Sequence, residues 1–337
     1  MTAAPISASC LTCLHQNSFR GTLPRSRPGA DLIPEVHRVR AVRFHQYGDP
    51  DVLAIEEVAE PHAGPGEIRI RVSAASVNPV DWKTRAGYLA EVMPATFPVI
   101  PGSDAAGVVD EVGAGVLDVQ IGDRVFGLGQ ATTAELAVLT AWAPVPGPWS
   151  LEQAAAAGLA VSTAVNGLDA LGDIAGKTVL IEGAAGGVGS AAVEIAVADG
   201  ATVIGTASEA NHEFLRGLGA TPITYGTGLA ERVAAVAPAG IGVALDLAGS
   251  GSLADLVAIV GDSARVASAA DFGAPALGVA MVQGNLNGPA NLAKASRLGE
   301  SGAYTPRIQA TFPIEKAAEA QAHVQSGHTQ GKVVITL

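Results

Sequence analysis

The chain is 337 residues long, 48% apolar, and carries a net charge of −12, so it is globular in composition and long enough for two domains. Residues 1–40 carry five Arg against Asp31 and Glu35, a net charge of +3, which leaves −15 on the remaining chain. This acidic body disfavours nucleic acid and anionic membranes as partners, and the chain has no unbroken apolar run of about 18 residues that could span a bilayer. We therefore expect a small-molecule substrate.

Residues 1–38 are rich in Ser, Pro and Arg, and we predict that they form a disordered leader. A transit peptide would share this composition; we favour upstream sequence read through before a true start near Val39. Both cysteines, Cys10 and Cys13, lie here, so the body has no disulfides and a cytoplasmic location is expected. Their C-x-x-C spacing lacks the second pair or the flanking elements of a zinc or redox site.

The first ordered region is expected to be mainly β, since from Arg40 to about Val145 short apolar runs are broken by Gly and Pro. Its clearest predicted strands are Ile68–Val72, Gly107–Val112 and Asp123–Phe126. An Ala-rich helical region, Leu151–Leu171, follows a Pro-bounded connector.

A strand, a glycine turn, a helix and a second strand are predicted between Lys177 and Ser208. The turn is Ala184-Ala-Gly-Gly-Val-Gly189, a G-x-G-x-x-G pattern with Ala in its first place. In a βαβ unit the amides at the helix start bind a pyrophosphate, here those of Ala185, Gly186, Gly187 and Val188. Gly186 allows close approach, and Gly189 lets the helix pack on the strand. The alternative is a Gly/Ala-rich turn without a ligand.

Strands and helices alternate after Thr206, which predicts a doubly wound parallel sheet that binds its ligand at the strand carboxyl ends. The predicted helices are 211–216, 229–236 and 253–260, and the predicted strands are 223–225, 242–247 and 265–269. From about Tyr304 the chain returns to β character, and Lys332–Leu337 is predicted to be a final strand that completes the first domain.

Ordered motifs over positions 40–337 resemble one family. They are Ala41-Val-Arg-Phe, Tyr47-Gly-Asp-Pro-Asp-Val-Leu53, Pro65-Gly-Glu67, Val77-Asn-Pro-Val-Asp-Trp-Lys83, Ile100-Pro-Gly-Ser-Asp-Ala-Ala-Gly107, Gly122-Asp-Arg-Val-Phe-Gly127, Gly183–Gly189 and Gly327-His-Thr-Gln-Gly-Lys332. The chain resembles the medium-chain dehydrogenase/reductase superfamily, in its zinc-independent quinone oxidoreductase branch. The resemblance implies an α/β protein with a GroES-like catalytic domain (39–160, completed by 304–337), a Rossmann domain (161–303), NADP(H) between them, and a homodimer.

The zinc-dependent members of this superfamily have a Cys and a Gly-His-Glu where this chain has Asn78-Pro-Val-Asp81 and Gly102-Ser-Asp104. Asp81 and Asp104 alone cannot supply the three good ligands of a catalytic zinc ion. The four cysteines of the structural zinc lobe are also missing. We therefore expect no metal site.

The end of the second Rossmann strand decides between NADP and NAD. NAD enzymes commonly have an acidic residue there, whereas this chain has Thr206-Ala-Ser208. Ser208 and Asn211 can donate hydrogen bonds to a 2′-phosphate, so NADP(H) is favoured. Two features oppose it: the Lys usual in the family is absent, and Glu209 is near. Alternatively, Ser208 and Asn211 cap the next helix.

Hydride transfer requires stabilisation of the negative charge that forms on the acceptor oxygen. Without a metal, a quinone or an α,β-unsaturated carbonyl is the expected acceptor, because it delocalises this charge. The resemblance places Asn78 in the nicotinamide pocket, with Asp81 beside it. Lys83 and Tyr88 are further candidates. The alternatives are a turn-fixing side chain for Asn78, a surface charge for Lys83 and loop packing for Tyr88.

The resemblance also places Thr163 near the nicotinamide amide and Tyr225 beside the adenosine half. Ala248 and Gly249 follow the fourth Rossmann strand and are expected to border the nicotinamide ribose. Lys332 belongs to a segment that closes on the cofactor; alternatively, it is a strand-edge charge. Thr163 could be an ordinary helix residue.

These patterns predict an NADPH-dependent, zinc-independent reductase of quinones or activated alkenes. An enoyl-thioester reductase is the alternative enzyme, although the acidic body disfavours a phosphorylated carrier. A non-catalytic NADPH-binding protein is the alternative outside enzymes.

Overall fold

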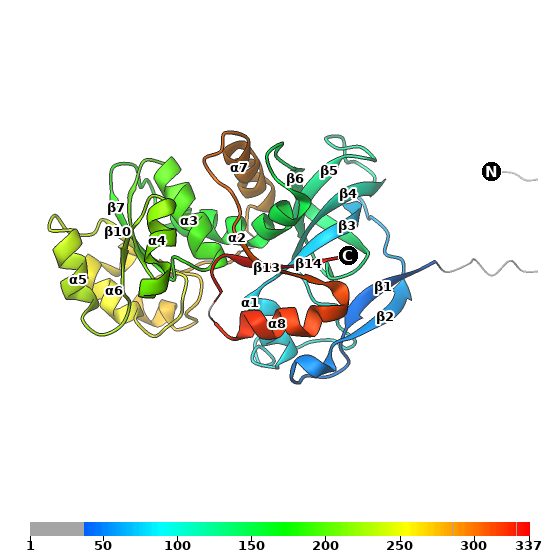
Figure 1. Cartoon of the computed structure of the whole chain (residues 1–337), viewed down its shortest axis with the longest axis horizontal. Helices are drawn as coiled ribbons and strands as arrows, with labels where there is room; N and C mark the ends of the chain where they lie inside the picture. Colours follow the sequence, from blue (N-terminus) through cyan, green and yellow to red (C-terminus); the bar gives the residue numbers. More distant parts are fainter. Residues whose placement is uncertain (1–36, 285, 328) are drawn as a thin grey trace, which may run out of the picture. The chain divides into compact units, whose positions relative to one another are not determined.

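The computed structural model describes residues 37–284, 286–327 and 329–337, and these residues form two six-stranded sheets and one two-stranded sheet (Figure 1). The predicted leader lies outside the described residues except for His37 and Arg38, and so does the Cys10-x-x-Cys13 motif. Arg38 already belongs to the first strand, two residues before the predicted start of order. No helix of the described chain is long and apolar enough to cross a membrane.

The first six-stranded sheet has the order β13-β14-β3-β4-β5-β6. Its strands are β3 (Ile68–Val77), β4 (Asp104–Val112), β5 (Arg124–Gly129), β6 (Leu136–Pro144), β13 (Ile308–Pro313) and β14 (Lys332–Thr336). The strands β1 (Arg38–Arg43) and β2 (Ala54–Ala59) pair separately. Strands β3 and β4 are longer than predicted because buried alanines, such as Ala75 paired with Ala105, continue the ladder.

The C-terminal strand lies inside the first sheet. β14 pairs antiparallel with β3, with Val333 opposite Val77, and parallel with β13 on its other side. The prediction that Lys332–Leu337 forms a strand of the first sheet is therefore confirmed. A chain end placed in the centre of a sheet brings Lys332 next to residues about 250 positions earlier.

The second six-stranded sheet is parallel, in the order β12-β11-β10-β7-β8-β9. Its strands are β7 (Thr178–Glu182), β8 (Thr202–Thr206), β9 (Thr221–Ile223), β10 (Val243–Asp246), β11 (Val266–Ser268) and β12 (Ala280–Met281). Its helices are α3 (Gly187–Ala198), α4 (His212–Gly217), α5 (Leu229–Val236) and α6 (Leu253–Val260). Successive residues of β7 belong to different cores: Val179 packs with α3 and α4, and Leu180 with α5 and α6. Helices thus cover both faces, as the doubly wound prediction requires.

Helix α2 (Leu151–Ala170) packs against both sheets. It begins at Ser150, whose hydroxyl accepts from the Gln153 amide, and it contacts β3, β4 and β5 as well as α3. Its many small side chains, such as Ala154 and Ala157, are fully buried and allow this close approach.

Three helices were not predicted: α1 (Pro79–Arg85), α7 (Gly288–Glu300) and α8 (Ala317–Gln325). The return to β character expected from about Tyr304 is confirmed by β13 and β14, but α8 interrupts it, and the buried positions Ala317, Ala320 and Gln321 of α8 follow helical spacing. Arg85 joins α1 to α8 by donating from Nε to Gln321 Oε1 over 2.8 Å. The predicted strand 223–225 is also misplaced, because β9 ends at Ile223. Tyr225 therefore lies in the following loop.

Candidate active site

The glycine turn between β7 and α3 has the geometry of a phosphate-binding turn. Gly183 has a φ of 73°, and Gly186 precedes the helix with extended backbone. The first helical hydrogen bond runs from the Ser190 amide to the Gly186 carbonyl over 2.8 Å, so the amides of 187–189 precede the helical ladder. A Cβ at Gly189 would lie 2.1 Å from the Gly183 oxygen, which confirms that Gly189 allows the helix to pack on the strand.

The backbone at Gly186 is open on the side where a Cβ would lie. A Cβ added at Gly186 would meet only the Gly183 oxygen, at 3.5 Å, so the approach to the amides is open on this side. At Gly187 the situation differs, because an added Cβ would lie 2.3 Å from Lys332 Cδ. The turn is thus open over Gly186 and covered by the Lys332 side chain over Gly187.

The segment before β14 reaches this turn from the first sheet. Gly331 forms a parallel bridge with Gly186, and its amide donates to the Ala185 carbonyl over 2.9 Å. Gly331 has a φ of 78°, which only glycine adopts readily. These contacts fix Lys332 directly beside the predicted phosphate turn.

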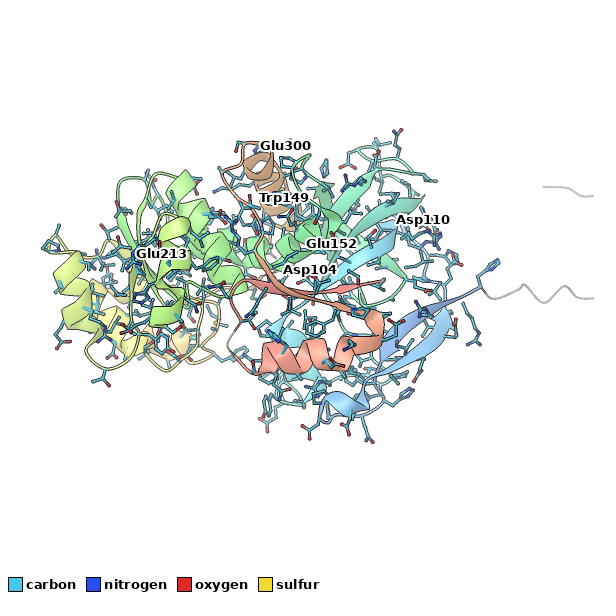
Figure 2. The ribbon with its side chains drawn as sticks, viewed as in Figure 1. Asp104, Asp110, Trp149, Glu152, Glu213 and Glu300 are labelled. Atoms are coloured by element: carbon cyan, nitrogen blue, oxygen red, sulfur yellow. The ribbon has the colours of Figure 1, made fainter. Side chains whose placement is uncertain are left out.

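Lys332, Asn78 and Asp104 form a buried polar chain, defined here as the Lys332 network. Lys332 Nζ donates to Asn78 Oδ1 over 2.5 Å and to the Val77 carbonyl over 3.2 Å. Asn78 Nδ2 donates to Asp104 Oδ1 over 2.7 Å, and the other Asp104 oxygen accepts from the Leu159 amide over 2.7 Å. Asp104, the first residue of β4 and labelled in Figure 2, thereby joins the first sheet to α2. Asn78 is thus held from both sides.

Burial shifts the pKa of each ionisable group of the Lys332 network towards its neutral form. Burial lowers the pKa of Lys332, and Asp104 and Asp81 oppose this shift. Burial raises the pKa of Asp104, with Lys332 the main opposing charge. Buried ionisable groups with shifted pKa values are typical of functional sites.

Asp81 lies beside the Lys332 network. It accepts from the Asn78 amide over 2.7 Å and from the Gly102 amide over 3.2 Å. Burial raises the pKa of Asp81 to about 7, and Asp104 adds to the shift while these amides and Lys332 oppose it. Asp81 therefore caps α1 and fixes the backbone of Asn78, which occupies the N-cap position of a capping box at the start of α1.

Lys83 and Tyr88, the other two predicted catalytic residues, gather around Trp82. The Lys83 ammonium lies 5.9 Å from the Trp82 ring centre, and Tyr88 packs edge-on against the same ring. Tyr88 is 70% exposed. The structure thus brings Asn78, Asp81 and Lys332 together and leaves Lys83 and Tyr88 as a separate group.

The predicted adenosine side lies at the carboxyl ends of β8 and β9. Ser208 and Asn211 occupy the N-cap positions before Glu209–Asn211 and α4, as the capping alternative expects, but neither makes a side-chain capping hydrogen bond. Asn211 Oδ1 instead accepts from Gln330 Nε2 over 2.8 Å, which ties this loop to the segment before β14. Tyr225 follows β9 and is 55% exposed.

The predicted nicotinamide side is shaped by Asp246 at the end of β10. Its Oδ1 accepts from the amides of Ala248 and Gly249, over 2.9 and 3.0 Å, and its Oδ2 accepts from Ser268 Oγ over 2.7 Å. Thr163 is a helix residue of α2, whose hydroxyl donates to the Leu159 carbonyl over 2.8 Å. A Cβ at Gly284 would lie 2.3 Å from the Thr163 hydroxyl, so this hydroxyl lies under the Gly284 segment.

Sequence reasoning missed the roles of Asp104, Asp246 and Gln330. Asp104 was considered only as a metal ligand, although a charge opening an otherwise apolar strand must find a buried partner. Lys332 at the start of β14 carries the same signal. The alternative hypothesis that Lys332 is a charge on an edge strand is wrong, because β14 is an interior strand and Lys332 is only 6% exposed.

The described part of the chain contains no group of three or more His, Cys, Asp or Glu side chains close enough to share a metal ion. Asp81 and Asp104 belong to the segments where the zinc-dependent members of the superfamily have zinc ligands. Near these two carboxylates the chain has the Lys332 ammonium rather than a third ligand.

Two family models match this chain. The model described as Alcohol dehydrogenase GroES-like domain matches residues 64–147, which include β3 to β6. The model described as Zinc-binding dehydrogenase matches residues 218–335, which include the later strands of the parallel sheet and most of β14.

Individual proteins are similar over most of their length. A 2-methylene-furan-3-one reductase of Solanum lycopersicum is 33% identical over 88% of this chain and 79% of its own. An NADPH-dependent alkenal/one oxidoreductase of Arabidopsis thaliana is 32% identical over the same shares of the two chains. The solved quinone oxidoreductase of Coxiella burnetii is 28% identical, with a TM-score of 0.77, over 89% of this chain and all of its own. The chain therefore belongs to the medium-chain dehydrogenase/reductase superfamily, in the quinone oxidoreductase-like branch, and is an oxidoreductase.

Proposed function

We propose that this protein is an NADP(H)-dependent, zinc-independent oxidoreductase that transfers hydride to a quinone or an α,β-unsaturated carbonyl. One observation carries the proposal: the glycine turn, in which the amides of 187–189 precede the helical ladder, pairs with Gly331 at Gly186, and the next residue, Lys332, binds Asn78. Two consecutive residues, Gly331 and Lys332, thus connect the proposed phosphate-binding turn with Asn78, the predicted acceptor-binding residue. The relatives named above reduce acceptors of this class according to their names.

The proposed cofactor supplies a hydride from C4 of its nicotinamide ring. Ala185, Gly186, Gly187 and Val188 would hold its diphosphate at the start of α3. Ser208, Asn211 and Tyr225 would hold the adenosine half, and Thr163, Ala248 and Gly249 the nicotinamide half. Lys332 would contact the cofactor beside Gly187, over which its side chain already lies.

Asn78 is the proposed donor to the acceptor oxygen. Its Nδ2 group has two protons, and Asp104 accepts one of them. The amide orientation is fixed because Lys332 binds the opposite end. A preorganised donor of this kind stabilises the enolate or quinol oxyanion that forms when a conjugated acceptor is reduced. Asp81, Lys83 and Tyr88 remain proposed as further site residues.

Zinc independence is proposed from the residues. Ser103 stands where the zinc-dependent relatives have His, and the amide of Asn78 is a poor zinc ligand. The Lys332 ammonium near Asp104 and Asp81 would repel a divalent cation. We also propose that the protein is a cytoplasmic homodimer. Its proposed domains are a catalytic domain, residues 39–160 completed by 304–337, and a Rossmann domain, residues 161–303.

The test follows NADPH absorbance with a panel of quinones, enones and enoyl thioesters, with and without a chelator, and with NADH in parallel. The expected result is chelator-resistant oxidation of NADPH by quinones or enones, and slower oxidation of NADH. Activity restricted to enoyl thioesters would favour the alternative enzyme. NADPH binding without turnover of any acceptor would favour a non-catalytic protein.

Gly186→Asp tests the phosphate site. The new Cβ has room, so the variant should fold, but its carboxylate would face the diphosphate and abolish NADPH binding. The control is Gly217→Asp, at an exposed α4 position where an added Cβ meets no atom within 4 Å. Unchanged NADPH affinity in Gly186→Asp would show that the phosphate binds elsewhere.

A further inference from the structure

The loop between β9 and α5 is wrapped around one arginine. Arg232 of α5 donates to four consecutive carbonyls: Nε to Thr224 over 2.8 Å, Nη2 to Tyr225 over 3.2 Å and to Gly226 over 2.9 Å, and Nη1 to Thr227 over 2.9 Å. We define residues 224–227 as the Arg232 loop. A guanidinium has five N–H donors, so most of them are used to hold this loop.

The Arg232 loop lies next to the segment predicted to bind the 2′-phosphate. Strands β8 and β9 are parallel neighbours, with Thr206 opposite Ile223, and the Ala207 amide donates to the Ile223 carbonyl over 3.0 Å. Ser208 therefore lies in the loop after β8, at the same sheet edge where Thr224 begins the loop after β9. The two loops are neighbours along the carboxyl ends of the sheet.

Because the carbonyl groups of the Arg232 loop are bonded to the guanidinium, its backbone amides are the groups left for another partner. Gly226 and Gly228 have φ values of 85° and 80°, and these two left-handed residues allow the chain to curl around the guanidinium. Within the described chain, the amides of residues 225–228 have no hydrogen-bond acceptor. Carbonyls that face a cation and amides left without acceptors together make a surface suited to an anion.

We infer that Arg232 determines cofactor specificity by positioning the Arg232 loop and by supplying the positive charge for the 2′-phosphate. This inference rests on the proposed use of NADP(H). It explains how the protein binds a 2′-phosphate although the loop after β8 has no lysine. Arg232 acts through the loop amides and the Tyr225 side chain, so it is a positioning residue rather than a contact to the reacting atoms.

Two acids oppose the charge of Arg232 in this region. Glu209 is exposed in the loop after β8, and Glu231 precedes Arg232 on α5. Both are on the surface, where solvent and salt weaken their repulsion. Arg232 is half-buried as a residue, and its Nε bond to the Thr224 carbonyl is more sheltered than its exposed Nη bonds.

The test compares 2′,5′-ADP with 5′-AMP, which differ only in the 2′-phosphate, by calorimetric titration of the purified full chain. The wild-type protein should prefer 2′,5′-ADP. In Arg232→Met this preference should fall about tenfold, equivalent to about 1.4 kcal/mol, mostly through weaker 2′,5′-ADP binding. The control is Arg216→Met, which removes an equally charged side chain from α4, where it pairs only with the exposed Glu213.

The outcomes separate this inference from the cofactor proposal. A wild-type protein that binds the two nucleotides equally would contradict NADP(H) specificity. A wild-type preference that persists in Arg232→Met, or equal weakening of both nucleotides, would overturn the inference alone. Arg232→Lys covers the case in which the Met variant does not fold: lysine has three donors, so the preference should fall selectively but less, and an unchanged preference would also overturn the inference.

Discussion

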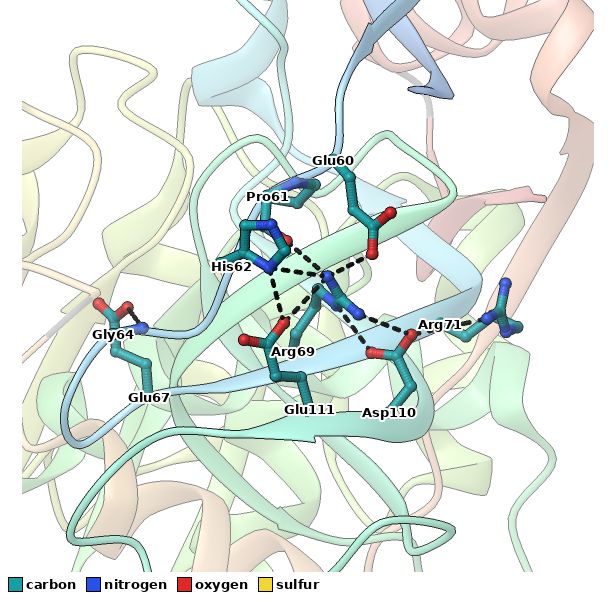
Figure 3. Close-up of polar contacts among 9 residues, drawn as sticks. All are labelled: Glu60, Pro61, His62, Gly64, Glu67, Arg69, Arg71, Asp110 and Glu111. Atoms are coloured by element: carbon teal, nitrogen blue, oxygen red, sulfur yellow. Dashed lines mark hydrogen bonds and ion pairs between the residues drawn. The ribbon is translucent and has the colours of Figure 1, made fainter. Parts of the chain in front are cut away.

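Two clusters of buried and half-buried charges show how burial separates a structural ion pair from a candidate functional site. The first is the Lys332 network. The second, shown in Figure 3, surrounds Arg69 of β3 and contains Glu60, Asp110 and Glu111, with Arg71 at its edge. We call it the Arg69 cluster. Each cluster joins a cation on one strand of the first sheet to a carboxylate on β4: Lys332 to Asp104 through Asn78, and Arg69 to Asp110 and Glu111.

The clusters differ in how fully their charges are paired. Arg69 lies 2.6 Å from Glu60, 2.9 Å from Asp110 and 2.9 Å from Glu111, and these carboxylates are 20–31% exposed. Although burial opposes it, the carboxylates raise the pKa of Arg69. In the Lys332 network an amide separates the ammonium from Asp104, and burial shifts both pKa values towards neutrality. The Arg69 cluster is therefore electrostatically satisfied, whereas the charges of the Lys332 network are less fully compensated, in keeping with the proposed site.

Lys332→Met is expected to have the largest effect. It removes the cation near Asp104 and one partner of Asn78, so stability should fall by about 3 kcal/mol, as expected when a buried charge loses its compensation. NADPH oxidation should also be lost. Urea unfolding and steady-state kinetics measure the two effects. The control is Lys316→Met, which breaks only an exposed pair with Glu319. Adding Asp104→Asn should recover part of the stability; no recovery would mean that the two charges are not coupled.

The pH dependence of stability should show the raised pKa of Asp81. Between the ordinary aspartate pKa of 3.8 and about pH 7, the folded carboxyl keeps a proton that the unfolded chain has lost. The folded protein is therefore fully stable with respect to this carboxyl below about pH 4. As the pH rises to about 7, the free energy of unfolding falls by up to about 4 kcal/mol. Asp81→Asn should remove this loss. The free energy of unfolding of both proteins is measured in urea at about pH 4 and about pH 8. The difference between the two proteins isolates the contribution of Asp81, because the other carboxyl groups contribute equally to both. If the free energies of unfolding of the two proteins changed equally with pH, the pKa of Asp81 would not be raised in the folded protein.

Arg69→Met should have a smaller effect, confined to stability. Three partly exposed carboxylates would be left together, at a cost of about 1–2 kcal/mol that added salt should reduce. NADPH affinity should not change. The control is Arg71→Met, which removes a 70% exposed side chain 3.6 Å from Asp110 and should cost less than about 0.5 kcal/mol. A loss of NADPH affinity in Arg69→Met would show that the Arg69 cluster also serves the site.

Local patterns predicted much of the second sheet. Helices α5 and α6 have the bounds that were predicted, because their apolar spacing and following Gly or Pro are local signals. The glycine turn was also found, since its residues are contiguous. By contrast, α8 was missed because its buried face consists of alanines and one glutamine, which give little hydrophobic contrast.

The candidate site was only partly predictable for a different reason. Asn78, Asp81 and Lys332 were named by resemblance, but their mutual contacts were not foreseen. Arg232 and Gln330 were not singled out, because a hydrogen bond from a side chain to a distant loop leaves no periodic signal. Figure 1 makes the reason visible: β14 is coloured as the end of the chain but lies next to β3.

The sequence by itself determined the alternation of strands and helices and the glycine turn, because neighbouring residues encode periodicity and backbone freedom. The tertiary structure alone decided which charges meet. Lys332 and Asn78 are 254 positions apart, and they form a hydrogen bond only because β14 pairs with β3 in one register. Burial in that register then sets their ionisation, since desolvation depends on every element packed around them.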